Sequence, residues 1–139
     1  AKLAEGLGRA PLEVWTVGTD KQRGSYLAVY NSEDQVRELD PDFRTLGQLG
    51  SMAVNPTAPG DDVDFVSRYF APTFGIDEDP VTGSAHCALT PFWSERLGKD
   101  KLRARQVSAR GGELRCERRP DCIVIAGNAA LYMEATITL

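Results

Sequence analysis

The chain has 139 residues, of which 42% are hydrophobic and 26% are charged, and this composition is typical of one compact domain. The net charge of −4 argues against binding to nucleic-acid phosphates, which requires a basic surface. No apolar run approaches the roughly 20 residues of a membrane span, and no stretch has the pattern of a signal peptide.

The three cysteines, an odd number, match no metal-binding spacing. We therefore expect a reduced, cytoplasmic protein without a bound metal. The arginines between residues 103 and 119 alternate with Glu113 and Glu117, and we interpret this segment as a solvated strand face.

The N-terminal half predicts short elements. Residues 4–7 form a helix that ends at Gly8. Residues 12–17 and 26–30 are rich in β-branched and aromatic side chains and predict a hairpin around a polar loop at 18–24.

The next segment alternates helices with strands. Ser32 is a good N-cap for a surface helix that ends before Pro41, and a second short helix follows before Gly50. A strand is predicted over 52–54, and the proline- and glycine-rich stretch 55–62 is predicted to be a loop.

The second half predicts one long helix among strands. Residues 63–71 read as a strand, and residues 83–97 form a helix whose apolar residues cover much of its circumference, so we expect it to be buried. Four strands follow, over 102–109, 112–117, 122–126 and 131–139. One buried helix among many strands indicates an α+β fold, in which a mostly antiparallel sheet curls into a barrel around one central helix.

The start of the long helix is the candidate functional site. Three consecutive acidic residues and a proline precede the first helical residue, Gly83. The first amides of a helix have no partner within it and lie at its positive end. Because Gly83, Ser84 and Ala85 are small, a carboxylate or oxyanion can approach these amides closely. The candidate substrate-binding residues are Thr82, Gly83, Ser84 and Ala85, and the acids beside them suit proton transfer.

The same residues permit a purely structural interpretation, in which the acidic run is a solvated turn that caps the helix. His86, the only histidine, is interpreted as a packed or hydrogen-bonded side chain. Cys87 is interpreted as a small core residue.

The order of residues from Gly75 to Trp93, which includes Asp-Glu-Asp-Pro-Val-Thr-Gly-Ser-Ala-His-Cys, resembles the signature of the PhzF-like family, the phenazine-biosynthesis isomerases and their relatives. The stretch 67–72 resembles the strand before that signature, and 106–114 resembles the strand and turn after the helix. The similarity covers most of the chain and is most specific over 65–114.

The resemblance implies a diaminopimelate epimerase-like fold of two similar domains, with the active site between them. Residues 1–139 would be a single domain equivalent to the C-terminal half. The family's phenazine enzyme isomerises a dihydro-hydroxyanthranilic acid by acid/base proton transfer, without a metal or organic cofactor. Carried over by position, Asp79 and Ser84 would be catalytic, and the amides of Gly83 and Ser84 would hold the carboxylate of a small substrate.

The resemblance also implies a missing part. The family's general base is a glutamate in the N-terminal half, beside a Gly-His segment, and this chain contains no Gly-His sequence. The expected partners are therefore a small carboxylate substrate and either an N-terminal domain or a second copy of the chain, which would form a homodimer through the interdomain face. The alternative function is a non-catalytic or self-associating half-domain that binds a small carboxylate.

Overall fold

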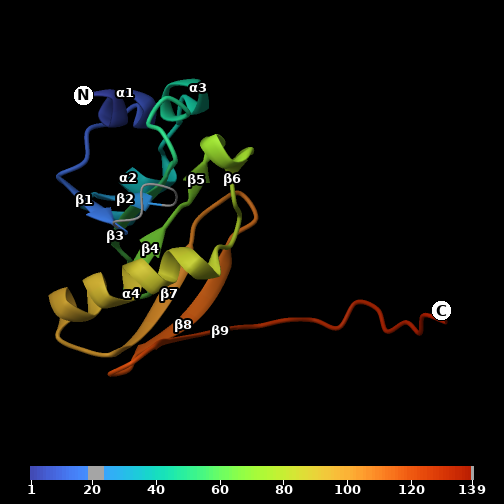
Figure 1. Ribbon diagram of the computed structural model, residues 1–139. Coiled ribbons are helices and arrows are strands. Elements are labelled where there is room, and N and C mark those ends of the chain that lie inside the picture. Colours follow the sequence, from blue (N-terminus) through green and yellow to red (C-terminus); the bar gives the residue numbers. More distant parts are fainter. Residues whose placement is uncertain (19–23, 139) are drawn as a thin grey trace.

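The computed structural model describes residues 1–18 and 24–138, and Figure 1 shows the arrangement of their helices and strands. The helices are α1 (Lys2–Leu7), α2 (Glu33–Arg37), α3 (Phe43–Leu46), the 3₁₀ helix η1 (Pro72–Phe74) and α4 (Gly83–Leu97). The strands are β1 (Glu13–Val17), β2 (Gly24–Val29), β3 (Met52–Pro59), β4 (Phe65–Ser67), β5 (Phe70–Ala71), β6 (Ile76–Glu78), β7 (Lys101–Gln106), β8 (Gly112–Arg118) and β9 (Ile123–Gly127).

The described strands form one mixed sheet of nine strands in the order β1-β2-β3-β4-β7-β8-β9, with β5 beside β3 and β6 beside β5. Strand β2 is parallel to β3, and β4 is parallel to β7, whereas the other pairs are antiparallel. The predicted α+β class is confirmed. The predicted barrel is wrong, because closure requires the two edge strands to pair, and β1 and β9 stand at opposite ends of the order.

The short N-terminal elements follow the capping signals in the sequence. Gly8 ends α1 with a left-handed φ of 69°, which glycine adopts without a steric penalty. The Ser32 hydroxyl accepts a hydrogen bond from the backbone N–H of Gln35 at the start of α2. The predicted hairpin is confirmed by the antiparallel pairing of β1 with β2, but residues 19–23 of its loop lie outside the described residues.

Helix α4 has the predicted boundaries and packs one face against the sheet. The rings of Trp93 and of Phe65 on β4 stack with centroids 5.7 Å apart. Trp93 is only 3% exposed, and its indole N–H donates to Thr57 Oγ1 at 2.9 Å, so its polar atom is satisfied inside the core. At the edge of the sheet, Trp15 of β1 meets Phe92 edge-on at 6.1 Å.

The opposite face of α4 is open, so the prediction that the helix is buried holds only for the face that packs against the sheet. Ser84 and Cys87 are exposed and Ala88 is half-buried. Cys87 is therefore not a core residue, although it follows the fully buried His86. The reason is geometric, since these residues lie on the side of α4 that faces a cavity rather than the sheet.

Two further predictions are wrong. Strand β3 continues to Pro59 through the stretch predicted to be a loop, because pairing with β2 and β4 overrides its prolines. The Pro56 carbonyl still accepts the Arg68 N–H at 3.0 Å. The strand predicted over 131–139 does not form in residues 131–138, which extend away from the sheet (Figure 1) and expose Leu131 and Tyr132.

Truncation of Trp93 to alanine should cost about 3–5 kcal/mol of unfolding free energy, because it leaves a cavity against Phe65 and removes the hydrogen bond from the indole to Thr57. The chain has two tryptophans, and Trp15, which is 51% exposed, is the matched control, with an expected cost of at most about 1 kcal/mol. Urea denaturation of the two variants measures the difference, and equal costs would contradict this description of the core.

Candidate functional site

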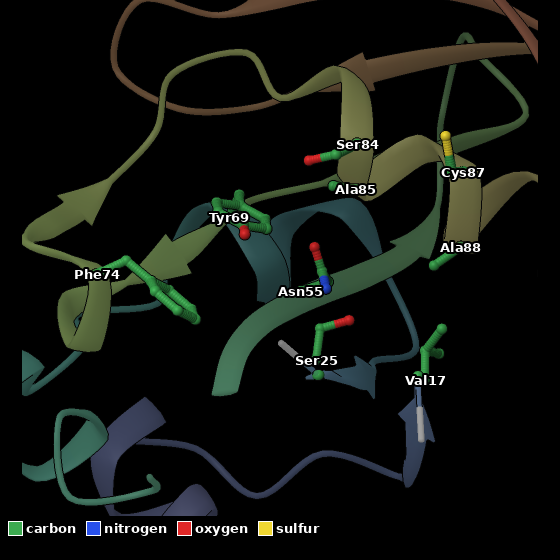
Figure 2. Close-up of a pocket in the computed structure, with 11 residues that line it drawn as sticks. Val17, Ser25, Asn55, Tyr69, Phe74, Ser84, Ala85, Cys87 and Ala88 are labelled. Carbon is green, nitrogen blue, oxygen red and sulfur yellow. The ribbon is translucent and has the colours of Figure 1, made fainter. Parts of the chain in front are cut away.

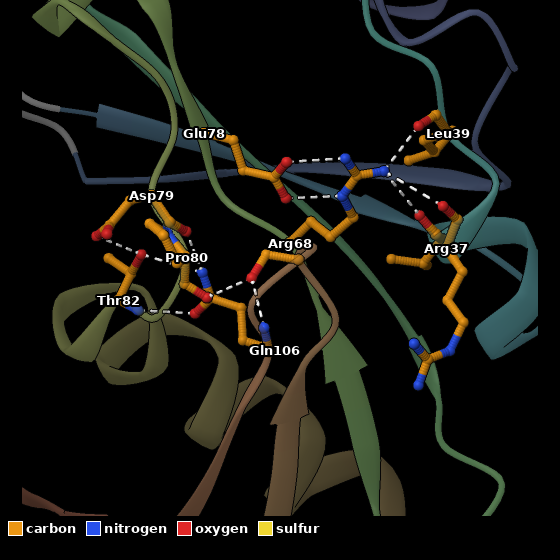
Figure 3. A network of polar contacts seen from close by, with 11 residues as sticks. Arg37, Leu39, Arg68, Glu78, Asp79, Pro80, Thr82 and Gln106 are labelled. Carbon is orange, nitrogen blue, oxygen red and sulfur yellow. Dashed lines mark hydrogen bonds and ion pairs between the residues drawn. The ribbon is translucent and has the colours of Figure 1, made fainter. Parts of the chain in front are cut away.

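The turn before α4 is held by the buried side chain of Gln106, the last residue of β7 (Figure 3). Its Oε1 accepts the Thr82 N–H at 2.8 Å, and its Nε2 donates to the Asp79 carbonyl at 2.6 Å and to Thr82 Oγ1 at 3.2 Å. The Thr82 hydroxyl in turn donates to Asp79 Oδ2 at 2.7 Å. Both hydrogen bonds of the Thr82 hydroxyl thus lie within the turn.

The first turn of α4 is left uncapped as a consequence. Thr82 occupies the N-cap position, but in the described structure its side chain accepts no hydrogen bond from the backbone amides of the helix. A Cβ built on Gly83 would meet no described atom within 4 Å, so the space in front of the helix is open. Free amides at a helix N-terminus attract anions through their hydrogen-bond donors and through the helix dipole.

A cavity of about 610 Å³ adjoins this helix start (Figure 2). Ser84 and Ala85 contribute to its wall from α4, and Asn55 of β3 and Tyr69 lie across from them. The cavity is lined by Val17, Gly18, Gly24, Ser25, Asn55, Tyr69, Phe74, Ser84, Ala85, Cys87 and Ala88. A space of this size fits a small molecule.

The structure separates the predicted site residues into two groups. Ser84 and Ala85 line the cavity, with Gly83 exposed at the helix start beside them. Asp79 and Thr82 lie in the turn behind it and are absent from the cavity lining.

Asp79 is connected to the cavity wall through Tyr69. The Asp79 N–H donates to the Tyr69 carbonyl at 3.0 Å. Burial, and to a lesser extent the charge of Asp79, raises the pKa of the Tyr69 phenol above its ordinary value of 10.0. Tyr69 therefore remains a protonated hydrogen-bond donor in the cavity wall at neutral pH.

An ion pair fixes the strand that leads into the turn. Arg68 donates to the Glu78 carboxylate from Nε at 2.8 Å and from Nη2 at 2.9 Å. Its third nitrogen, Nη1, donates to the Leu39 carbonyl at 2.7 Å (Figure 3). Both side chains are largely buried. A bidentate pair of this kind constrains orientation as well as distance, so Glu78 is a structural residue of the acidic run.

The glycine pair after β7 packs against the same turn. A Cβ on Gly112 would lie 2.4 Å from a methyl group of Val81, so only glycine fits without movement of the turn. Ser108 adds a hydrogen bond from its hydroxyl to the Pro80 carbonyl at 2.9 Å.

His86 is a packed residue, as predicted. It is fully buried, its Nδ1 lies 2.8 Å from the Thr82 carbonyl, and its ring contacts Phe65. Because a carbonyl can only accept, Nδ1 carries the proton. Burial lowers the pKa of His86, and the hydrogen bond to Thr82 opposes this only in part.

Sequence reasoning missed the polar residues across from α4. The prolines that follow Asn55 predict a loop at that residue. The pattern around Tyr69 and Gln106 predicts only that both lie in strands. The signal that could have found Asn55 is an amide flanked by apolar residues, Ala53 and Val54, in a strand.

Within residues 1–18 and 24–138, no group of three or more His, Cys, Asp or Glu side chains could hold a metal ion. In the same ranges, no helix has the length and apolar character needed to span a membrane.

The fold and the cavity define an α+β protein whose candidate small-molecule site lies at a helix N-terminus. A sequence model described as "phenazine biosynthesis-like protein" matches residues 3–135. A Pseudomonas aeruginosa protein named as an isomerase is 48% identical over 138 residues, which are 99% of this chain and 51% of that protein. The human phenazine biosynthesis-like domain-containing protein is 57% identical over 76 residues, which are 54% of this chain and 26% of that protein.

Solved structures agree with these matches. A PhzF-family phenazine biosynthesis protein of Enterococcus faecalis superposes with a TM-score of 0.86 at 41% identity, covering 95% of this chain and 49% of that one. A PhzC/PhzF protein of Clostridium difficile gives a TM-score of 0.84 at 39% identity, covering 99% and 51%. The chain belongs to the phenazine biosynthesis-like, or PhzF-like, family and spans about half the length of the Pseudomonas aeruginosa relative.

His86 should make stability depend on pH. Its pKa is lower in the folded state than in the unfolded chain, so below about pH 6.5 the unfolded chain binds a proton that the native state does not. The unfolding free energy should then fall as pH drops from 7.5 to 5.5, by at most ~1.4 kcal/mol per pH unit. Urea titrations at both pH values test this. The His86→Gln variant, which cannot titrate, should lose less stability, and parallel losses would contradict the assignment.

Proposed function

We propose that this chain forms one wall of an isomerase active site that moves a proton on a small carboxylate-bearing substrate without a metal or organic cofactor. Substrate and product of such a reaction have the same composition, so no oxidant or reductant is needed. The observation that carries the proposal is the uncapped start of α4 beside the cavity of about 610 Å³.

The amides of Gly83 and Ser84 are proposed to bind the substrate carboxylate. They lie at the positive end of a 15-residue helix, where an anion is stabilised by the dipole and by unpaired N–H groups. The open space in front of Gly83 and the exposure of Ser84 support this. The Ser84 hydroxyl, in the cavity wall, would give the substrate one more hydrogen bond.

Asp79 is proposed to hold or transfer the moving proton. It is half-buried, and the Thr82 hydroxyl fixes one of its carboxylate oxygens at 2.7 Å. A substrate bound at the helix start would lie close to this turn, because Asp79 precedes Gly83 by only four residues. General acid/base groups of this kind typically contribute about 10²–10⁴ in rate.

The opposite wall is proposed to come from an N-terminal domain of the same polypeptide, so that residues 1–139 act as one of two domains. The curated relatives extend to about twice the matched length, and a complete isomerase needs a general base that this wall does not supply. The rim of the cavity includes the exposed ring of Phe74. Ile76 is exposed two residues further on, and exposed apolar side chains beside a cavity are typical of a surface that another domain covers. This arrangement is the one we favour over self-association of the isolated half.

Asp79→Asn in the full natural polypeptide should reduce turnover at least about 100-fold, while its unfolding free energy stays within about 1 kcal/mol of the parent. The assay is isomerisation in D₂O, with deuterium incorporation into a dihydro-hydroxyanthranilic acid and other small unsaturated carboxylates read by mass spectrometry.

Asp77→Asn is the matched control, because it makes the same change on an exposed acid of the same run, and it should leave turnover within about twofold of the parent. Equal turnover in the Asp79 and Asp77 variants would show that Asp79 only supports the turn. Absence of exchange in the parent protein with every probe would contradict the proposed reaction.

A further inference from the structure

The amide of Asn55 is buried without a partner. The residue is 1% exposed, and neither Oδ1 nor Nδ2 has a hydrogen-bond partner among the residues that the structure describes. Buried amides are almost always hydrogen-bonded, since an unsatisfied one loses its hydration without compensation. Buried side-chain atoms of Ser67, His86, Thr90 and Ser94 also lack a partner in the described structure, but among these residues Asn55 alone lines the candidate cavity.

The side chain of Asn55 lines the candidate cavity. Figure 2 shows it standing on β3, with Tyr69 and Ser84 on one side of it and Ser25 on the other. Its unpaired polar atoms thus lie in the wall of the cavity that the start of α4 also borders.

Packing alone would favour an aliphatic residue at this position. In the pairing of β2 with β3, Asn55 lies opposite Leu27, which belongs to the apolar cluster beneath α4 together with Phe65 and Leu89. The preceding residue, Val54, belongs to a second apolar cluster, separate from the one beneath α4. An amide between two apolar clusters destabilises the free protein, and a ligand that pairs with it would remove that cost.

We infer that Asn55 is a substrate-binding residue that selects carboxylates carrying a second polar group, a hydroxyl, within reach of its amide. The inference rests on the proposed function, which places the carboxylate at Gly83 and Ser84. A primary amide offers one acceptor and two donor hydrogens, and a hydroxyl complements it because it both donates and accepts. A purely anionic group would leave Oδ1 unpaired, and a purely cationic group would leave Nδ2 unpaired.

The test compares dissociation constants of benzoate and of the three hydroxybenzoates for the full natural polypeptide, measured by calorimetry. A ring suits the apolar part of the lining, Val17, Phe74 and Ala85. At least one hydroxybenzoate should bind about 10-fold more tightly than benzoate, which is the effect of one well-placed hydrogen bond in a desolvated site. Asn55→Leu, similar in shape, should reduce that ratio to about one.

Two control variants separate the possible failures. Asn31→Leu, the same change at an exposed position, should leave the ratio as in the parent. Gly83→Val fills the open space before the helix amides and should weaken binding of benzoate and the hydroxybenzoates alike. If Gly83→Val weakens both ligands while Asn55→Leu keeps the ratio, the role of Asn55 is wrong and the carboxylate site stands. If Gly83→Val changes neither affinity, the proposed function fails and the role of Asn55 fails with it.

A measurement on the unaltered protein covers the case in which Asn55→Leu does not fold. The side-chain amide of Asn55, labelled with ¹⁵N, gives its own NMR signals. These signals should shift when the selected hydroxybenzoate is added, and shift much less with benzoate. Equal shifts with the two ligands, or no hydroxybenzoate that binds more tightly than benzoate, would overturn the inference.

Discussion

The buried amide of Gln106 is the interaction on which the geometry of the site depends. It pairs with the carbonyl of Asp79 and with the N–H and hydroxyl of Thr82, so all its polar atoms are satisfied without solvent. The hydroxyl of Thr82 is directed to Gln106 and Asp79 and does not cap α4. An ordinary threonine N-cap would compete with a ligand for the helix amides. The pairing of β7 with β4 places Gln106 there, opposite Ser67.

Two further contacts hold the turn before α4 in the same position. The pair of Arg68 and Glu78 fixes the strand before the turn, and Gly112 permits the close approach of Val81. The helix amides and the amide of Asn55 are, in contrast, left without partners in the described structure. Hydrogen-bonded surroundings beside groups that lack partners are what a preorganised site requires.

Features set by local signals could be predicted from the sequence. The boundaries of α4 followed from its apolar pattern and from Gly83 at its start, and Ser32 and Gly8 were capping signals of the ordinary kind. The family signature placed the candidate site at the same helix start, where Ser84 and Ala85 line the cavity.

Features set by tertiary pairing could not be predicted. The prolines at 56 and 59 indicated a loop, yet they lie in β3 because strands on both sides pair with it. The alternating segment 131–138 has the pattern of a strand but pairs with no described strand. Cys87 on α4 is exposed and Asn55 on β3 is buried. Neither could be predicted, because both depend on which elements lie beside the cavity.

The central claim, that the start of α4 binds the carboxylate of a small substrate, is tested most directly by a crystal structure. Crystals of the full natural polypeptide would be grown with 4-bromobenzoate, whose bromine locates the ligand by anomalous scattering. The account predicts the carboxylate oxygens within about 3.2 Å of the Gly83 and Ser84 amide nitrogens, with the ring in the cavity beside Asn55. A ligand bound elsewhere, with these amides facing only solvent, would contradict it.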